Sequence, residues 1–256
     1  MLKVCNLSAG YSKVPIIKNI SFELKKGEIA CILGQNGSGK TTLLKACAGI
    51  ISSLSGEVFI NGENILNKKR KDIAKLLSLM SGLQPAHFSY TVFQTVMLAR
   101  YAHSEKSFLS EGFSKADTER VNAILENLHI YSLRDKLLTE VSSGQLQKVF
   151  LARTIAQDTP VIFLDEPTSH LDLKAQIEIC KKLKTLAQEK KVSMLAVFHD
   201  INLAMQLADR LILIKDGKLF ENSKKENFDY KKINHLYETD VQNFMLKSFE
   251  FWKSSL

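Results

Sequence analysis

The chain has 256 residues, a net charge of +8 and an ordinary globular composition, with 45% hydrophobic and 24% charged residues. That length accommodates one large domain or a domain with a subdomain. No apolar run approaches the roughly 20 residues of a membrane-spanning helix, and the first residues lack the features of a signal peptide. We therefore expect a cytosolic chain that needs another protein to hold it at a membrane.

The positive charge permits an anionic partner, but the basic residues are scattered and are mostly lysines. The densest basic run, at residues 68–71, favours a solvated turn before a helix over a nucleic-acid patch. The four cysteines have no C-x-x-C spacing. They are typical of small core residues in a reducing compartment, not of a metal site or disulfides.

The first 60 residues show a pattern of short strands separated by turns, which indicates an antiparallel β part beside an α/β core. The predicted strands are Leu2–Leu7, Ile16–Ile20, Ser21–Leu24, Gly27–Leu33 and Gly56–Gly62.

The next predicted elements are a helix at Lys71–Leu77 and an apolar strand at Leu76–Met80. The segment 81–85, which contains glycine and proline, then marks a boundary between two parts of the chain. Apolar residues recur with the period of a helix over Thr91–Arg100 and Ala116–Leu128. We therefore predict a helical insertion from about residue 85 to about residue 141.

Helices and strands then alternate, which predicts a mostly parallel sheet covered by helices on both faces. The elements are a helix at Gln145–Ala156, a strand at Val161–Leu164, a helix at Leu173–Ala187, a strand at Val192–Phe198, a helix at Ile201–Leu207 and a strand at Arg210–Ile214. A turn at Asp216-Gly217 precedes a tail with one short helix around Lys231–Tyr237. The predicted fold class is an α/β P-loop NTPase core with an N-terminal antiparallel β subdomain and an inserted helical subdomain.

The most informative stretch is a glycine-rich loop between the apolar run 29–33 and a helical pattern at 43–48. Glycines let successive backbone N–H groups turn inward around phosphate oxygens, and the helix N-terminus adds its free N–H groups. The G-x-x-x-x-G-K-T spacing places Lys40 to reach the β- and γ-phosphates and the Thr41 hydroxyl to bind Mg²⁺. This spacing strongly disfavours an ordinary glycine-rich turn. The predicted nucleotide-binding residues are Gly34, Gln35, Asn36, Gly37, Ser38, Gly39, Lys40, Thr41 and Thr42.

Two acids, Asp165 and Glu166, follow the apolar run 161–164. Because ligands bind beyond the carboxyl ends of parallel strands, Asp165 is placed to hold Mg²⁺ and Glu166 to polarise an attacking water. The alternative is a pair of acids that only caps a strand end. His199 follows the next strand at the same edge, where it is either a γ-phosphate contact or a structural histidine, and its position favours the contact.

Two further segments have both a structural and a functional interpretation. Tyr11 lies in an early turn, and its ring has two possible roles that the sequence supports about equally. It either stacks on an adenine ring or fills the edge of a strand. The residues Ser142, Ser143, Gly144 and Gln145 open a helix, either as a plain N-cap or as a second anion site. Since the glycine loop already binds phosphate from one side, a second phosphate-binding helix start favours a nucleotide held between two faces.

This ordered set of motifs, GQNGSGKTT, VSSGQ, VIFLDEPTSHLD and a histidine after the next strand, resembles the ATPase subunit of ABC transporters over about residues 1–220. The resemblance implies that residues 34–42 are the Walker A loop, which binds ATP. Asp165 and Glu166 would then be the Walker B Mg²⁺ carboxylate and the catalytic base. Residues 142–145 would be the signature, which closes on the γ-phosphate bound by the other subunit.

The same resemblance implies an adenine-stacking role for Tyr11, a dimer-contacting D-loop at residues 169–172 and a switch role for His199. Members of the family work as head-to-tail ATPase dimers beneath two membrane subunits. A homodimer at the cytoplasmic face of the membrane is therefore expected.

Two positions depart from the family pattern. Ser143 stands where the family has glycine, and its side chain is expected to weaken closure on phosphate. Ungapped alignment places Gly82 at the glutamine of the Q-loop, and Gln84 lies two residues further on. Either Gln84 serves as the Mg²⁺ contact in a shifted loop or that contact is altered, and the sequence leaves both open.

Within the family, segments 88–92, 98–100 and 233–241 resemble importers of the iron-siderophore, haem or vitamin B12 type, on less specific motifs. This resemblance implies ATP-driven import of a metal chelate, with a multi-span membrane permease and an extracytoplasmic substrate-binding protein as partners and no nucleic acid. The alternatives are an importer of another substrate class and a soluble ABC-type ATPase that acts on nucleic acid or ribosomes. The predicted organisation is an ATPase domain at 1–220 and a tail at 221–256.

Overall fold

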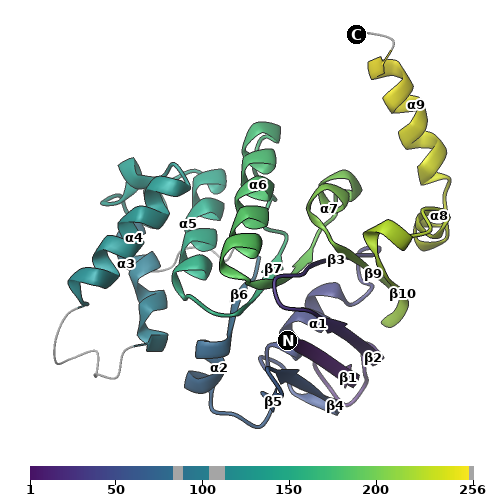
Figure 1. The fold of residues 1–256 in the computed structure, drawn as a ribbon, viewed down its shortest axis with the longest axis horizontal. Helices are drawn as coiled ribbons and strands as arrows, with labels where there is room; N and C mark the ends of the chain where they lie inside the picture. The colour runs from purple at the N-terminus through teal and green to yellow at the C-terminus, as the bar shows by residue number, and fades with distance from the viewer. Residues whose placement is uncertain (83–88, 104–112, 254–256) are drawn as a thin grey trace.

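A computed structural model describes residues 1–82, 89–103 and 113–253 of the protein, without the side chains of residues 251 and 252. Two sheets and a group of helices make up this part of the chain (Figure 1). The larger sheet has the strand order β10-β9-β3-β8-β7-β6, and the smaller one the order β2-β1-β4-β5. The predicted combination of a mostly parallel sheet, an antiparallel N-terminal sheet and helices is therefore confirmed.

In the larger sheet, only the pairing of β10 with β9 is antiparallel, and β9, β3, β8, β7 and β6 run parallel to one another. The carboxyl ends of these five strands consequently share one edge. Their bounds are β3 (Ile29–Leu33), β6 (Leu77–Met80), β7 (Val161–Asp165), β8 (Ser193–Val197), β9 (Arg210–Lys215) and β10 (Lys218–Lys224).

The smaller sheet consists of β1 (Leu2–Ala9), β2 (Ile17–Leu24), β4 (Ser53–Ile60) and β5 (Glu63–Asn64). The two strands predicted at 16–20 and 21–24 form the single strand β2. Its pairing with β1 shifts register between Leu7 and Ala9, beside Asn19, which has a φ of 51°. The strand therefore contains an irregularity at this asparagine but is not interrupted, and the predicted division between residues 20 and 21 is absent.

The helices lie along the faces of the larger sheet. On one side are α3 (Val92–Met97), the 3₁₀ helix η1 (Leu98–His103), α4 (Lys115–Asn127), α5 (Ser143–Ala156), α6 (Leu173–Lys190) and α7 (Ile201–Leu207), and between the two sheets is α1 (Lys40–Cys47). The helix predicted at 91–100 is thus divided between α3 and η1. The remaining helices are α2 (Arg70–Leu76), the 3₁₀ turns Tyr131–Leu133, Leu138–Glu140 and Lys225–Asn227, α8 (Lys231–Tyr237) and α9 (Val241–Lys253), the last of which was not predicted.

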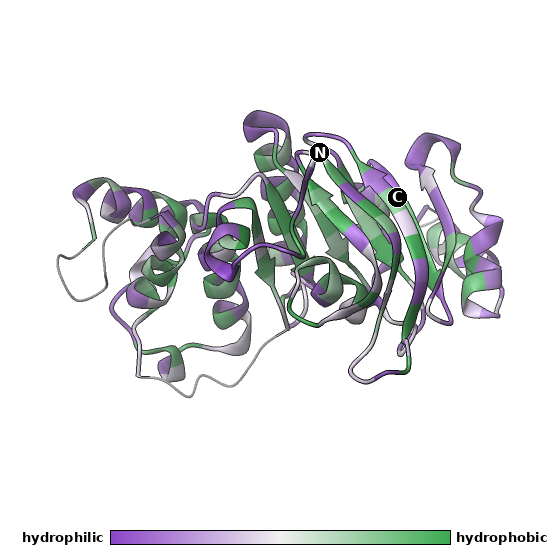
Figure 2. Cartoon of the chain, turned by 90° about the horizontal axis from the view of Figure 1, so that it is seen from below, coloured by the Kyte–Doolittle hydropathy of each residue, from purple (hydrophilic) through white to green (hydrophobic). Residues whose placement is uncertain are grey.

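Strand β3 shows why the core has two layers. All five of its residues are buried, and alternate side chains enter different clusters. Cys31 packs with helices such as α5 and α6, whereas Ile32 packs with α1 and the smaller sheet. Figure 2 shows these hydrophobic strands at the centre, with hydrophilic residues on the surrounding helices. A strand buried on both faces explains the unbroken apolar run that precedes the glycine loop.

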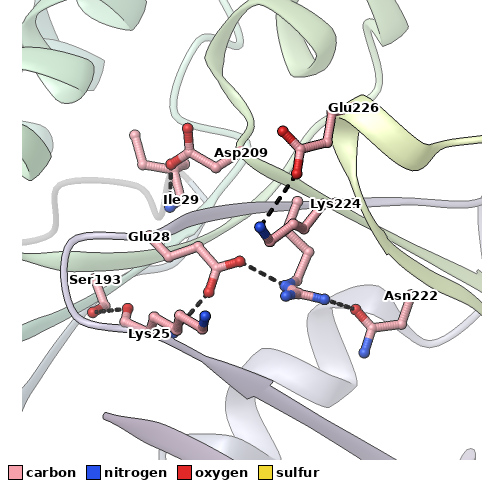
Figure 3. Close-up of polar contacts among 9 residues, drawn as sticks. Lys25, Glu28, Ile29, Ser193, Asp209, Asn222, Lys224 and Glu226 are labelled. Atoms are coloured by element: carbon pink, nitrogen blue, oxygen red, sulfur yellow. Dashed lines mark hydrogen bonds and ion pairs between the residues drawn. The ribbon is translucent and has the colours of Figure 1, made fainter.

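The amino ends of β3, β8 and β9 are joined by polar contacts (Figure 3). Glu28 accepts hydrogen bonds from the Lys25 backbone N–H and from Arg210 Nε, each at 2.7 Å. The Ser193 hydroxyl donates to the Lys25 carbonyl at 2.8 Å, and Asp209 accepts from the Ile29 N–H at 3.0 Å. These bonds fix the turn that leads into β3 and hence the strand that carries the glycine loop.

We predict that Glu28→Ala lowers the free energy of unfolding by about 2 kcal/mol, because the Glu28 side chain is 9% exposed and its loss leaves Arg210 without its carboxylate. Urea denaturation of the nucleotide-free protein measures this loss. The matched control is Glu23→Ala, which removes a carboxylate from an exposed pair with Lys3 and should cost clearly less than Glu28→Ala, because water screens an exposed pair. Equal losses in the two variants would contradict this account of the turn.

Candidate functional site

The glycine loop lies at the carboxyl edge of the larger sheet, between β3 and α1. Gly37 and Gly39 have φ angles of 79° and 99°, which favour glycine. A Cβ on Gly34 would lie 2.7 Å from Ser38 Oγ and closer still to the carbonyl oxygen of Ile214. The loop therefore has the backbone geometry of a phosphate-binding nest.

Lys40, at the start of α1, is buried and closes the loop. Its Nζ donates to the Gly34 carbonyl at 2.8 Å and to the Gln35 carbonyl at 2.9 Å. Burial lowers the pKa of this amine, while the nearby carboxylates of Glu166 and Asp165 act in the opposite direction. A phosphate in the loop would give the ammonium group a stronger acceptor than these two carbonyls.

Asp165 ends β7, and the structure brings it to Thr41, as the sequence predicted for neighbours at one sheet edge. The Thr41 hydroxyl donates to Asp165 Oδ1 at 3.1 Å, and Asp165 is 6% exposed. Burial raises the pKa of this carboxyl group, although the Thr41 hydrogen bond partly offsets the effect. Two hard oxygen atoms side by side in a buried place are suited to Mg²⁺.

Glu166 follows directly and has a φ of 54°, which turns its side chain away from that of Asp165. Its Oε1 lies 2.6 Å from His199 Nε2, so the two side chains are within hydrogen-bond distance. The buried Gln147 donates to the Glu166 carbonyl at 2.7 Å, and so does the Ser169 hydroxyl at 3.0 Å. Sequence reasoning identified Glu166 and His199 but not Gln147, whose contact depends on how α5 packs against the end of β7.

The start of α5 is a second anion-binding candidate. Ser142 is its N-cap, and Ser142 and Gln145 form a capping box, with backbone-to-side-chain hydrogen bonds of 2.9 and 3.3 Å. Both Ser142 and Ser143 are exposed, and a Cβ on Gly144 would lie 3.0 Å from the His170 carbonyl oxygen. Helices α5 and α1 are drawn apart in Figure 1, although α5 reaches the carboxyl edge of the sheet through the bond from Gln147 to the Glu166 carbonyl.

Tyr11 lies between β1 and β2 and is 63% exposed, as a stacking platform must be. The end of the same loop reaches the glycine loop, because a Cβ on Gly39 would lie 2.8 Å from Ile17. Of the two Q-loop candidates, Gly82 follows β6 at the carboxyl edge of the sheet, whereas Gln84 lies outside the described residues.

Two contacts to the glycine loop come from the last third of the chain. The Gly217 N–H donates to the Ser38 carbonyl at 3.1 Å, from the turn between β9 and β10. Gln35 Nε2 donates to the Leu236 carbonyl at 3.0 Å, from the end of α8. The Asp-Gly dipeptide predicted the turn, but nothing in the sequence indicated that this turn and the tail support the loop.

The described residues contain no helix that is both long and apolar enough to cross a bilayer. In the same residues, no three side chains of His, Cys, Asp or Glu gather in a way that would hold a metal ion. These features define the class of the domain as a P-loop NTPase.

Comparison with known proteins identifies the family. The family model described as "ABC transporter" matches residues 17–169. The ABC transporter ATP-binding protein MJ0873 of Methanocaldococcus jannaschii is 37% identical over 95% of this chain and 83% of its own length. The petrobactin import ATP-binding protein YclP of Bacillus subtilis is 32% identical over 94% of both chains.

Similarity to solved structures indicates the same family. An ABC transporter described as metal-chelate type, in an inward-facing conformation, has a TM-score of 0.78 at 26% identity and covers 93% of this chain and 88% of its own. A dimeric structure of the ATP-binding cassette MJ0796 with ADP and Pi has a TM-score of 0.77 at 26% identity, over 89% and 100%. The chain therefore belongs to the ABC transporter family, as an ATP-binding cassette with ATPase activity.

We predict that Asp165→Asn raises the melting temperature of the nucleotide-free protein. The raised pKa means that burial penalises the charged carboxylate in the folded state, so this residue costs stability at pH above its folded pKa, and a neutral amide relieves that cost. The gain should shrink as pH falls through the folded pKa, because the wild-type carboxyl group then becomes neutral too. Thermal unfolding at neutral and acidic pH measures this difference in melting temperature between the variant and the wild type. A variant that is less stable than the wild type at neutral pH would contradict the prediction.

Proposed function

We propose that this chain is the ATP-hydrolysing subunit of an importer of metal chelates of the iron-siderophore, haem or cobalamin class. It would work as a head-to-tail homodimer on the cytoplasmic face of the membrane, beneath a multi-span permease that receives cargo from an extracytoplasmic substrate-binding protein. The ATPase domain would comprise residues 1–220, with a helical insertion at about 85–141 and a tail at 221–256. No nucleic-acid partner is proposed.

The proposed dimer rests on one observation, namely that the two phosphate-binding candidates, the glycine loop and the start of α5, are separate segments of one chain. The glycine loop, Asp165 and Glu166 would form a phosphate cradle at the sheet edge, whereas the exposed Ser142 and Ser143 begin α5, which Figure 1 draws apart from α1. A second chain in head-to-tail arrangement would bring its α5 to this cradle, so that each ATP lies between two subunits. The dimeric cassette described above supports this arrangement.

In this proposal ATP is the substrate, and each residue of the cradle has one role. The loop N–H groups and Lys40 bind the phosphates, and the exposed ring of Tyr11 stacks on the adenine. Glu166 accepts a proton from the attacking water as the water oxygen bonds to the γ-phosphorus and the bond to the leaving ADP oxygen breaks. His199 lies 2.6 Å from Glu166 through its Nε2. When ATP is present, a ring N–H of His199 would donate to the γ-phosphate in place of Glu166.

The residues also fit Mg²⁺, because Thr41 Oγ1 and Asp165 Oδ1 are oxygen ligands that already lie together. When bound there, the ion supplies positive charge to the phosphate oxygens. Gln84, as the third proposed ligand, lies outside the described residues.

Two observations support the substrate class. The relative YclP is named for petrobactin import, and the inward-facing structure above is of the metal-chelate type. The segment Tyr90-Thr91-Val92, which carried the resemblance to such importers, forms the N-cap of α3, with Thr91 and Gln94 in a capping box. Transport assays with the cognate permease and radiolabelled ferric chelates test this class, and transport of an amino acid or sugar instead would assign another.

We predict that Glu166→Gln abolishes steady-state ATP hydrolysis by at least about 100-fold, since the amide cannot accept the proton from water. ATP binding should persist, and the ATP-bound variant should be a stable dimer. Phosphate release and sedimentation velocity measure the two effects. As a control, Lys40→Ala should lose ATP binding itself. Unchanged hydrolysis in Glu166→Gln would remove Glu166 from the role of base.

We predict that Ser143→Gly raises the ATPase rate several-fold, because a hydrogen replaces a hydroxymethyl group where the backbone would approach phosphate. Initial-rate kinetics across a range of ATP concentrations measure the change. The neighbouring Gly144 provides a matched comparison, since Gly144→Ala should lower the rate by crowding the His170 carbonyl. A lower or unchanged rate in Ser143→Gly contradicts this interpretation of Ser143.

A further inference from the structure

The end of α8 is held by two other parts of the chain. A helix leaves its last carbonyl groups without partners inside the helix, so donors from elsewhere must satisfy them. In α8, the His235 carbonyl accepts from Lys215 Nζ at 3.0 Å, and the Leu236 carbonyl accepts from Gln35 Nε2 at 3.0 Å. One of these two donors belongs to β9, and the other belongs to the glycine loop.

The part of α8 that meets the loop is firmly packed. Leu236 is fully buried and Ile233 is nearly so, and both belong to the main hydrophobic core. Tyr237, the last residue of the helix, packs against the same core. Burial raises the pKa of its hydroxyl group, and a hydrogen bond with the Gly34 backbone partly offsets this shift. Helix α8 is therefore a fixed support for the loop.

The contacts of α8 fall on the same two residues that Lys40 holds. Lys40 Nζ donates to the carbonyls of Gly34 and Gln35. An anionic phosphate is a stronger acceptor than a carbonyl, so a bound nucleotide would draw the ammonium group away from both. The contacts with Leu236 and Tyr237 do not involve Lys40 and can persist when it moves. They would then hold this part of the loop in place.

We propose that Gln35 and Tyr237 are positioning residues for nucleotide binding, which join the glycine loop to α8 and keep its backbone in the phosphate-binding conformation when Lys40 turns to phosphate. The inference rests on the proposed role of the loop as the ATP site and deepens it, because it gives the segment after residue 220 a part in that site. The G-x-x-x-x-G-K-T spacing leaves residue 35 unspecified, so the motif did not indicate this role for its side chain.

The first test measures the affinity of the full chain for Mg-ADP by isothermal titration calorimetry, because ADP binding to the loop does not require a second chain. Gln35→Ala should raise the dissociation constant about fivefold, as expected for the loss of one supporting hydrogen bond. Tyr237→Phe, which removes only the hydroxyl group, should raise it by a similar factor. Gln35 is exposed, so its loss should leave the fold intact, which circular dichroism verifies. An unchanged constant in either variant removes that residue from the role.

The matched control is Lys215→Ala. It removes the neighbouring hydrogen bond to the His235 carbonyl and the ion pair with Glu238 at 2.8 Å, so it loosens the same end of α8 from β9 without touching the loop. Its dissociation constant for Mg-ADP should match that of the wild type. An increase equal to that in Gln35→Ala would show that the docking of α8 as a whole matters, and would overturn the role of Gln35.

The second test separates positioning from stability. Without nucleotide, Lys40 still holds both carbonyls in Gln35→Ala, so the melting temperature should stay close to the wild-type value. The rise in melting temperature on adding a fixed concentration of Mg-ADP should be smaller in the variant, because this stabilisation depends on the ratio of ligand concentration to dissociation constant. A lower melting temperature without nucleotide, together with an unchanged rise on adding Mg-ADP, would assign Gln35 to fold stability alone and overturn the proposal.

The outcomes separate this inference from the proposed function. If Lys40→Ala binds Mg-ADP as tightly as the wild type, the glycine loop is not the nucleotide site, and the proposed function and this inference both fail. If Lys40→Ala loses binding while Gln35→Ala and Tyr237→Phe keep the wild-type dissociation constant, only the role of α8 fails. Weaker binding in all three variants, with Lys215→Ala unchanged, supports both.

Discussion

The Lys40 ammonium group donates two hydrogen bonds, to the carbonyls of Gly34 and Gln35. These bonds fix the conformation of the glycine loop, which is sterically constrained. They close a loop in which a side chain on Gly34 would collide with its surroundings and Gly39 takes a left-handed conformation. A loop of this kind needs firm support on both sides. The doubly buried strand β3 supplies it before the loop, and α1, packed between the two sheets, supplies it after the loop.

The rest of the carboxyl edge is arranged around that loop. Parallel pairing places β8 beside β3 and β7 beside β8, so that Asp165 at the end of β7 reaches Thr41 and His199 after β8 reaches Glu166. Helix α5 belongs to the helices on one face of the sheet, and Figure 1 draws it apart from α1. In the proposed head-to-tail dimer, hydrolysis would depend on association between chains, which is the property a transport motor requires.

Most of this arrangement followed from local patterns. Runs of buried residues, glycine spacing and strand-end acids each depend on neighbours in the sequence, so the sheet, the loop and the Asp165–Glu166 pair were predictable. The contact from Gln147 was not, because it joins a helix to a strand end 19 residues away through packing alone. The division predicted between Ile20 and Ser21 was wrong, because β2 continues through it from Ile17 to Leu24. Helix α9 was not predicted, although Val241, Met245 and Phe249 recur at the four-residue spacing of a helix.

Mixing two inactive variants tests the central claim most directly. Lys40→Ala disables the cradle, and Ser143→Glu places a negative charge where the exposed α5 start would meet phosphate. If each ATP lies between a cradle and the α5 start of the other chain, a mixed dimer retains one intact site, formed by the cradle of the Ser143→Glu chain and the α5 start of the Lys40→Ala chain. The account predicts that ATP hydrolysis reappears when the two inactive proteins are mixed. A mixture that stays inactive, although sedimentation detects mixed dimers, would contradict it.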